Sequence, residues 1–303
     1  MRLARGALRV CFAGCALLLA FGAQGDARAE PMDYCYGYFD VSGNHDNYVY
    51  ALLDEALRRT AGKWGPYDLR TVAEVPRNRQ IRALETGSGS ITFAVLGTGH
   101  DIDKHLRPIP IPVDKGLEGY RLLLVRRDDQ KRFAAVHAPA DLKPFIFGQN
   151  FTWDDVDILR ANGLTVQTGD DFDGLFQMLN RGRFDAFPRG VGEIGHEFLE
   201  YGPRDPALAI ETDLLIHYPL PIYFWFPRTP EGDKQAERLE EGLRAMIADG
   251  GYDVLFWKYH RAALQKLGLA HRRVLELDNP FLPADTPLSE SRLWLSPEQL
   301  GVR

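Results

Sequence analysis

The sequence predicts an α/β fold divided into two lobes. Short runs rich in branched and aromatic residues alternate with amphipathic helical runs along the chain, an order typical of α/β architecture. A block in the middle of the chain has a strand–helix alternation of its own. Two segments, near 122–127 and 213–221, flank this block. We expect them to carry the chain from one lobe to the other and back.

The amino end has the pattern of a secretory signal peptide. Three Arg in the first nine residues precede an apolar run at 11–23, and residues 27–29 form an A-x-A cleavage signal. The apolar run is shorter than the roughly 20 residues that a membrane-spanning helix needs. We expect cleavage between Ala29 and Glu30, a periplasmic location, and a mature chain that does not span the membrane.

Cleavage at this point changes the charge and the cysteine count. Residues 1–29 hold four Arg and one Asp, so their removal takes the formal net charge from −6 to −9. An acidic chain without a basic patch argues against a nucleic-acid partner. Cys35 is the only cysteine left, so no disulfide forms within the mature chain. We expect Cys35 to pack in a strand core.

The first lobe is expected from residues 30–127 and 216–303. Its early elements alternate between strands and helices, and the helix over 47–60 carries Leu52, Leu53 and Leu57 on one face. The expected order before the middle block is strand 34–39, helix 47–60, strand 67–73, helix 77–85, and strands 90–96 and 119–125.

The second lobe is expected from residues 128–215. Gly163 and Gly182 each follow a helical run and end it, and Gly182 is expected in a left-handed turn. The expected order is strand 145–148, helix 154–161, strand 164–167, helix 170–180, strand 184–187 and helix 193–200.

The chain then returns to the first lobe. Apolar runs at 214–217 and 222–226 precede two helices, 233–248 and 252–267, which Gly250 and Gly251 separate. The Pro-rich tail from Arg272 is expected to lie extended across the surface.

Three stretches of this sequence resemble solute-binding protein family 3, which serves polar amino acid uptake. Residues 178–186, MLNRGRFDA, resemble its L-x-x-G-R-x-D-A signature, and residues 221–226, PIYFWF, resemble its return strand. Residues 239–260 resemble its closing helices. The likeness runs in order along the mature chain, and further strings resemble a proteobacterial subgroup. The resemblance implies a type II periplasmic-binding-protein-like fold with a cleft between the lobes that closes on a ligand.

The chain departs from the pattern that the resemblance implies for α-amino acids. An Arg is expected in the turn at 98–106, but that turn contains none. An Asp is expected just past G-R-x-D-A, where this chain has Gly190. The chain therefore lacks both charged anchors that the resemblance implies for a standard α-amino acid, and Arg189 favours an anionic solute if it faces the cleft. The alternative is that Arg189 forms a surface or interlobe salt bridge.

Other side chains are candidates for the ligand site, each with a purely structural alternative. Arg77 and Arg79 begin a helix, and Arg121 lies in an apolar strand where it needs a partner if buried. The backbone before the helix at 154–161 can receive an anion. The candidate ligand-binding residues are Tyr38, Arg77, Arg79, Thr98, Arg121, Gln149, Asn150, Trp153 and Arg189.

Catalytic and metal signatures are weak. The sequence lacks a G-x-S-x-G elbow and a P-loop, and the helix with His196 and Glu197 lacks the second His of a zinc protease. Acidic pairs such as Asp154-Asp155 open helices, where negative charge is favourable. We expect no catalytic residue, metal or cofactor.

These patterns favour a monomeric periplasmic protein that captures a small polar solute. Its expected partner is an inner-membrane ABC permease or a sensor. Two alternatives stay open: an enzyme on the same fold, resembling a dehydratase, and an accessory protein that has lost its ligand.

Overall fold

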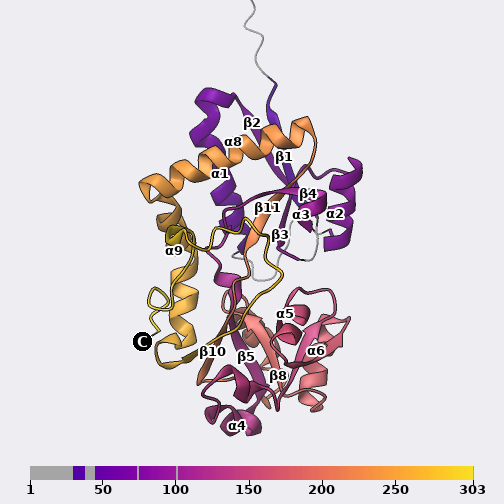
Figure 1. Ribbon diagram of the computed structural model, residues 1–303, viewed down its shortest axis with the longest axis vertical. Coiled ribbons are helices and arrows are strands. Elements are labelled where there is room, and N and C mark those ends of the chain that lie inside the picture. Colours follow the sequence, from indigo (N-terminus) through magenta and orange to yellow (C-terminus); the bar gives the residue numbers. More distant parts are fainter. Residues whose placement is uncertain (1–29, 38–44, 74, 100–101, 303) are drawn as a thin grey trace, which may run out of the picture. The chain divides into compact units, whose positions relative to one another are not determined.

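The computed structural model describes residues 30–37, 45–73, 75–99 and 102–302. Residues 31–303 form one compact unit (Figure 1). The predicted signal peptide and Tyr38 lie outside the described residues. Among the described residues, no helix is both long enough and apolar enough to cross a membrane.

Within the described residues, two small sheets and five helices form the group of elements that we call lobe 1. The first sheet pairs β1 with β2 in parallel, and the second has the antiparallel order β3-β11-β4. The backbone N–H of Thr92 donates to the carbonyl of Cys35 over 2.7 Å, which ties β1 to the segment before β3. The strands are β1 (Met32–Gly37), β2 (Tyr67–Val72), β3 (Ala94–Gly97), β4 (Leu106–Ile109) and β11 (Ile222–Pro227).

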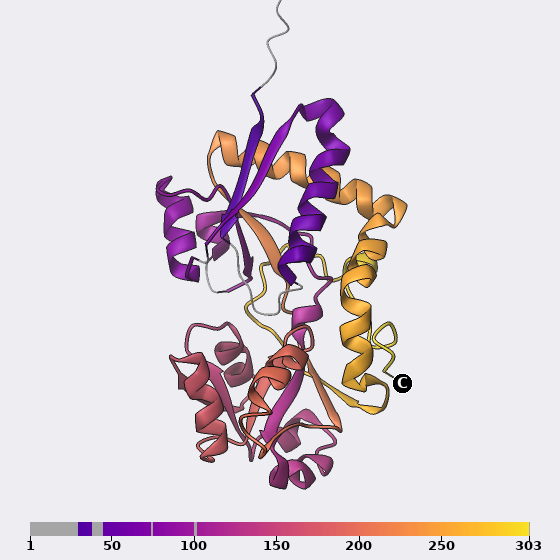
Figure 2. The ribbon, with the colours of Figure 1, turned by 180° about the vertical axis from the view of Figure 1, so that it is seen from behind.

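The helices of lobe 1 pack on each other as well as on the sheets. Helix α1 lies against α8 and α9, and α8 covers β11, as the view from behind shows (Figure 2). Gly250, with φ of 82°, makes the left-handed turn between α8 and α9, as the sequence predicts. The helices are α1 (His45–Trp64), α2 (Arg77–Thr86), α3 (Ile102–His105), α8 (Pro230–Asp249) and α9 (Gly251–Leu264).

A seven-stranded sheet forms the centre of what we call lobe 2. Its order is β12-β10-β5-β8-β6-β7, with β9 paired to β5. Strands β8, β6 and β7 are parallel to one another and β5 is antiparallel to β8. The strands are β5 (Tyr120–Arg126), β6 (Ile146–Asn150), β7 (Thr165–Gly169), β8 (Ala186–Gly190), β9 (Leu208–Ile210), β10 (Leu214–His217) and β12 (Arg273–Glu276).

Short helices flank this sheet, and their apolar faces pack against it. The side chain of Asp171 accepts the backbone N–H of Gly174 and caps α6. Gly182, with φ of 68°, makes the predicted left-handed turn after α6. The helices are α4 (Gln130–Ala134), α5 (Asp155–Ala161), α6 (Phe172–Asn180) and α7 (Ile194–Tyr201).

The expected helices and strands are present, with ends that differ by a few residues. The short elements α3, α4, β4, β9 and β12 were not predicted, because three to five residues give no readable periodicity. Cys35 is fully buried in β1, as expected. The tail differs from its prediction: it contributes strand β12, and Leu293, Leu295 and Val302 are buried in the main core.

Strands β5 and β12 fall in ranges that the sequence assigned to lobe 1, yet both pair within the lobe 2 sheet. We therefore propose that the chain crosses between the lobes at 112–119, before β5, and at 218–221, after β10. We call these the first and second crossing segments.

Candidate functional site

The carboxyl ends of β6, β7 and β8 lie at one edge of the lobe 2 sheet. In open α/β sheets ligands bind in the crevice outside this edge. Because β5 is antiparallel to β8, the start of β5 reaches the same edge, and Arg121 lies opposite Gly190. The candidate site therefore combines the first residues of β5 with the loops that follow β6 and β8.

Arg121 is the centre of a buried charge network at this edge. Its side chain is 3% exposed, and its guanidinium lies 2.6 Å from Glu118 Oε1 and 2.9 Å from Asp155 Oδ1. Glu193 Oε2 lies 3.9 Å away. The hydroxyl of Tyr218, in the second crossing segment, donates to Asp155. The partner that a buried Arg requires is thus supplied by several carboxylates.

Glu118 is the most unusual acid of the network. Burial raises the pKa of its carboxyl to about 8 against the opposing effect of Arg121, and the charge of Glu193 adds to the rise. Its side chain keeps one-fifth of its surface exposed. A Cβ on Gly190 would lie 2.8 Å from Glu118 Oε2. The carboxylate of Glu118 therefore sits over the glycine, where the resemblance placed an Asp.

Arg189 lies next to Gly190 in β8, so its side chain projects from the opposite face of the sheet to that of Arg121. It is 3% exposed. Its Nη2 lies 2.5 Å from Glu197 Oε1 and 2.9 Å from Glu193 Oε2. The guanidinium also lies 4.5 Å from the centre of the Trp153 ring. The positive charge of Arg189 is thus balanced by carboxylates of the chain itself.

Residues of lobe 1 meet the loop after β6. Arg77 Nη2 lies 3.5 Å from Asp154 Oδ2 and donates to the carbonyl of Gly97 over 3.2 Å. A Cβ on Gly99 would overlap the Asp154 carboxylate. Thr98, between these glycines, is 1% exposed, and its hydroxyl has no hydrogen-bond partner among the described residues. The end of β3 and the start of α5 are therefore in direct contact.

The remaining predicted residues have varied positions. Gln149 is fully buried, its Nε2 donates to the carbonyl of Pro188 over 3.4 Å, and its Oε1 has no partner within the described chain. Asn150 accepts from the backbone and hydroxyl of Thr152. Arg79 is exposed on α2. Gln149 and Asn150 thus lie at the sheet edge, whereas Arg79 shares no described contact with it.

Carboxyl groups outnumber guanidinium groups in this region. Three guanidinium groups, those of Arg77, Arg121 and Arg189, face six carboxyl groups. Five of the six make the ion pairs: Glu118, Asp154, Asp155, Glu193 and Glu197. The sixth is Asp114, and burial raises the pKa of its carboxyl to about 6. Asp154 and Asp155 stand at the start of helix α5, so their carboxylates would repel an anion bound there. Among the described residues no group of side chains has the composition of a metal site.

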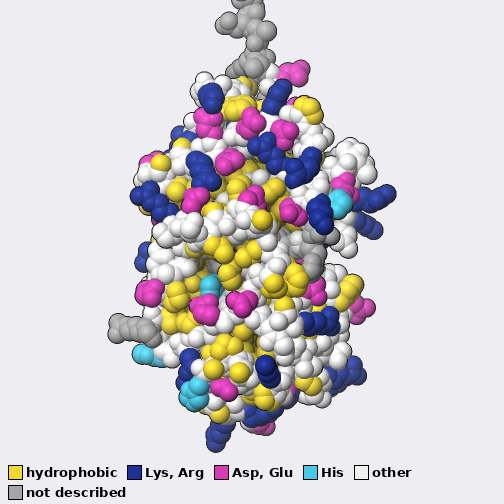
Figure 3. Space-filling view, viewed as in Figure 1, with side chains coloured by type: hydrophobic (Ala, Val, Ile, Leu, Met, Phe, Trp, Pro, Cys, Tyr) yellow, Lys and Arg dark blue, Asp and Glu magenta, His cyan; other side chains and the backbone are white. Residues whose placement is uncertain are grey.

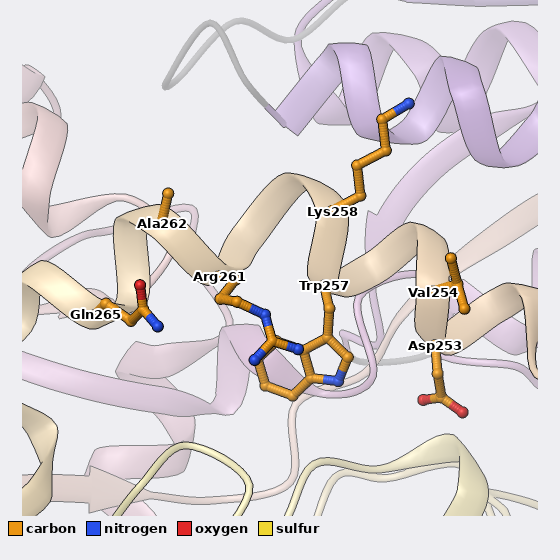
Figure 4. A pocket seen from close by; sticks show the side chains of 7 residues that line it. All are labelled: Asp253, Val254, Trp257, Lys258, Arg261, Ala262 and Gln265. Atoms are coloured by element: carbon orange, nitrogen blue, oxygen red, sulfur yellow. The ribbon is translucent and has the colours of Figure 1, made fainter.

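Two hollows lie away from this edge. The first, of about 610 Å³, is lined only by residues 253–265 of α9 and the turn after it. Figure 4 shows Trp257 and Arg261 together on one side of the helix, with Lys258 directed away from them. A single helix forms this wall, so the hollow does not surround a solute as ligand pockets do.

The second hollow, of about 440 Å³, lies where the C-terminal tail meets the first crossing segment and the start of α9. Lys115 and Asp253 line it together with five tail residues: Ser291, Arg292, Trp294, Ser296 and Gln299.

On the face that Figure 3 shows, Lys and Arg side chains are interspersed with Asp and Glu and form no continuous basic patch.

No protein-family model and no curated protein matches this sequence. Solved structures do match. An ancestral arginine-binding protein bound to arginine is 17% identical, with a TM-score of 0.51, over 75% of this chain and 98% of that chain. A mutant of the arginine-binding protein from T. maritima is 19% identical, with a TM-score of 0.51, over 76% and 96%.

A third match is an amino acid ABC transporter substrate-binding protein from Streptococcus pneumoniae bound to L-arginine. It is 12% identical, with a TM-score of 0.52, over 76% of this chain and 94% of that chain. The fold of this chain is therefore the two-lobed α/β fold of the periplasmic binding proteins, and the predicted fold class is confirmed.

Sequence reasoning missed most of the acids at the sheet edge. Asp154 and Asp155 were assigned to a helix start, and the helix of Glu197 was considered only for zinc. Glu118 stands in the string GLEGYRLLLVR, directly before the strand that carries Arg121. A carboxylate three residues before a buried Arg was the signal that could have identified the pair.

Proposed function

We propose that this chain is a solute-binding protein of the periplasm that captures a small polar solute at the carboxyl edge of the lobe 2 sheet. The observation that carries the proposal is the charge network around Arg121, which lies where ligands bind in folds of this kind. Lobe 1 supplies Arg77, which pairs with Asp154, and the turn at 97–99, whose glycines lie against the same carboxylate. An inner-membrane ABC permease or a sensor would receive the loaded, monomeric protein.

The excess of carboxylates supports a solute with a cationic group. The sequence favoured an anion through Arg189, but Glu193 and Glu197 already balance that guanidinium. Glu118 and Glu193 each keep about one-fifth of their side chain exposed, at 20% and 19%. An ammonium or guanidinium between them would favour the ionised form of Glu118, which burial disfavours, and so lower the raised pKa of its carboxyl. Amino acids, including arginine, are therefore the first solutes to test, because the similar solved structures bind them.

A thermal-shift screen of the secreted chain tests the proposal. The panel contains neutral and cationic amino acids, dicarboxylates and organic phosphates. A solute that binds the native state raises the unfolding midpoint in a concentration-dependent way. We expect a cationic or zwitterionic solute to do so, and Glu118→Gln to remove the shift. Glu231→Gln, on the exposed start of α8, is the matched control and should keep it.

Two results would contradict the proposal. One is a panel without any stabilising solute. The other is stabilisation by dicarboxylates alone that persists in Glu118→Gln, because the solute would then bind by another group and at another place.

A second candidate function, an enzyme on this fold, has one observation in its favour. Glu118 is a partly exposed carboxyl whose pKa is raised to about 8, and a protonated acid beside carboxylates can serve as a general acid. One similar structure is the ancestral amino acid-binding protein AncCDT-1, a precursor of cyclohexadienyl dehydratase, 17% identical. Product formation from a stabilising solute, lost in Glu118→Gln, would favour this function over binding alone.

A further inference from the structure

The C-terminal segment 277–302 runs from the lobe 2 sheet to the main core and contacts both crossing segments on its way. Figure 1 shows it as the yellow trace that leaves the region of β10 and ends beside α9. Leu293, Leu295 and Val302 are buried in the main core. Leu277 and Asn279 are buried near its start, so the segment has buried side chains toward both of its ends. We call it the strap.

The first crossing segment is held in a strained, capped turn. Lys115 has φ of 58°, the one positive value at a non-glycine residue of the described chain. The carboxylate of Asp114 accepts the backbone N–H groups of Gly116 and Glu118 over 3.1 and 2.8 Å. A left-handed Lys is unfavourable by itself, so other contacts must hold it there.

The strap supplies most of those contacts, and Asp253 of α9 adds an ion pair. Lys115 is 1% exposed, and its Nζ donates to the carbonyl of Arg292 over 2.5 Å and lies 2.8 Å from Asp253 Oδ1. The backbone N–H of Leu295 donates to the carbonyl of Lys115 over 2.9 Å. The Trp294 ring covers Gly116 so closely that a Cβ there would lie 2.6 Å from it. A buried ammonium needs such partners, because its desolvation is costly.

The strap also binds the second crossing segment. The Asn279 side chain donates to the carbonyl of Pro219 over 2.8 Å. Directly before that segment, the backbone N–H of Leu277 donates to the carbonyl of His217, the last residue of β10, over 2.7 Å. Further on, Arg244 of α8 pairs with Glu290 over 2.9 Å. One continuous segment thus joins both connections between the lobes to elements of each lobe.

We propose that the strap is a hinge clamp: it holds the two crossing segments in one geometry and thereby sets how freely the lobes reorient. Closure of a two-lobed protein is absorbed by large φ and ψ changes in a few hinge residues. Here such changes at 112–119 require Lys115 and Gly116 to separate from the strap. The inference concerns the hinge alone and stands whether or not the proposed solute binds.

Interlobe distance measurements test the clamp. Spin labels are placed through Arg82→Cys on α2 and Arg160→Cys on α5, both exposed, while Cys35 is buried. Two clamp variants of the full secreted chain are compared with the parent. Lys115→Asn keeps a residue that tolerates the left-handed turn but removes the ammonium. Trp294→Ala removes the ring over Gly116. Arg292→Ala is the matched control, because only the backbone carbonyl of Arg292 is bonded to Lys115.

We expect both clamp variants to broaden the interlobe distance distribution. We also expect amide exchange at 113–119 to become faster, on the order of tenfold, as its local opening becomes easier. Arg292→Ala should match the parent in both measurements. If Lys115→Asn and Trp294→Ala are folded and leave both the distances and the exchange unchanged, the strap does not clamp the hinge. Exchange that rises equally throughout the chain would also overturn the proposal, because it would report global destabilisation.

Discussion

Replacing Arg189 by Met tests whether its guanidinium is a structural partner of the buried acids. Arg189 is 3% exposed and Glu197 is 2% exposed, and the two side chains form bonds of 2.8 and 2.5 Å. Removing one member of such a pair leaves an uncompensated buried charge, which costs about 3–5 kcal/mol. Met fills much of the same volume, so the charge rather than a cavity accounts for the loss.

The loss should depend on pH. Burial raises the pKa of Glu197, and the attraction of Arg189 opposes that rise. In Arg189→Met the opposition is gone and the folded-state pKa rises further. A carboxyl whose pKa is higher in the folded state stabilises that state below its ordinary, unfolded-state pKa. This stability is lost as pH rises through the folded-state value. The deficit of the variant should therefore be largest near pH 7 and shrink as the pH falls toward the ordinary range of Glu.

Urea unfolding of the secreted chain measures both effects. The double variant Arg189→Met with Glu197→Leu should recover most of the lost free energy, because it also removes the buried carboxylate that the single variant leaves without its partner. Arg183→Met, an exposed residue before β8, is the matched control and should change stability by less than about 0.5 kcal/mol. A loss below about 1 kcal/mol in Arg189→Met would refute the reasoning, as would a double variant no more stable than the single one.

Three further predictions concern the Arg121 network. The raised pKa of Glu118 makes the folded state hold a proton that the unfolded state releases. The unfolding free energy should therefore fall as the pH rises from about 5 to 8. Glu118→Gln should reduce the slope of this fall by up to ~1.4 kcal/mol per pH unit, and an unchanged slope would contradict the prediction. Gly190→Ala places a Cβ 2.8 Å from Glu118 Oε2, so the substitution should displace that carboxylate. Calorimetric titration should then show weaker binding of an identified solute, and an unaltered affinity would exclude Glu118 from the site. Tyr218→Phe removes the buried donor to Asp155 and should lower unfolding free energy by about 1–3 kcal/mol in urea titration; a change near zero would mean that the bond adds nothing.

The fold could be predicted because its signals are local. The helices α1, α8 and α9 show clear apolar periodicity over 14 to 20 residues, and glycines mark several of their ends. Strand β12 could not be foreseen, since its pairing with β10 joins residues about 60 positions apart. The tail was wrongly predicted to lie extended across the surface, because its few buried side chains are spread among prolines and polar residues and form no periodic pattern.

The site was harder to predict because it depends on register. Arg121 was singled out as a buried Arg in need of a partner, and the partners were found. The sequence could not show that Arg189 and Arg121 project from opposite faces, or that Glu118 covers Gly190, because both follow from the pairing of β5 with β8. The charge of Arg189 therefore suggested an anionic solute, although its acidic partners lie four and eight residues farther along the chain.

Hydrogen exchange with and without a stabilising solute tests the central claim most directly. A solute held at the carboxyl edge of the lobe 2 sheet should protect the backbone at 97–99, 118–121, 150–155 and 190–193, and leave α9 unchanged. Protection confined to residues 253–265, which line the hollow on α9, would place the solute elsewhere and contradict the account.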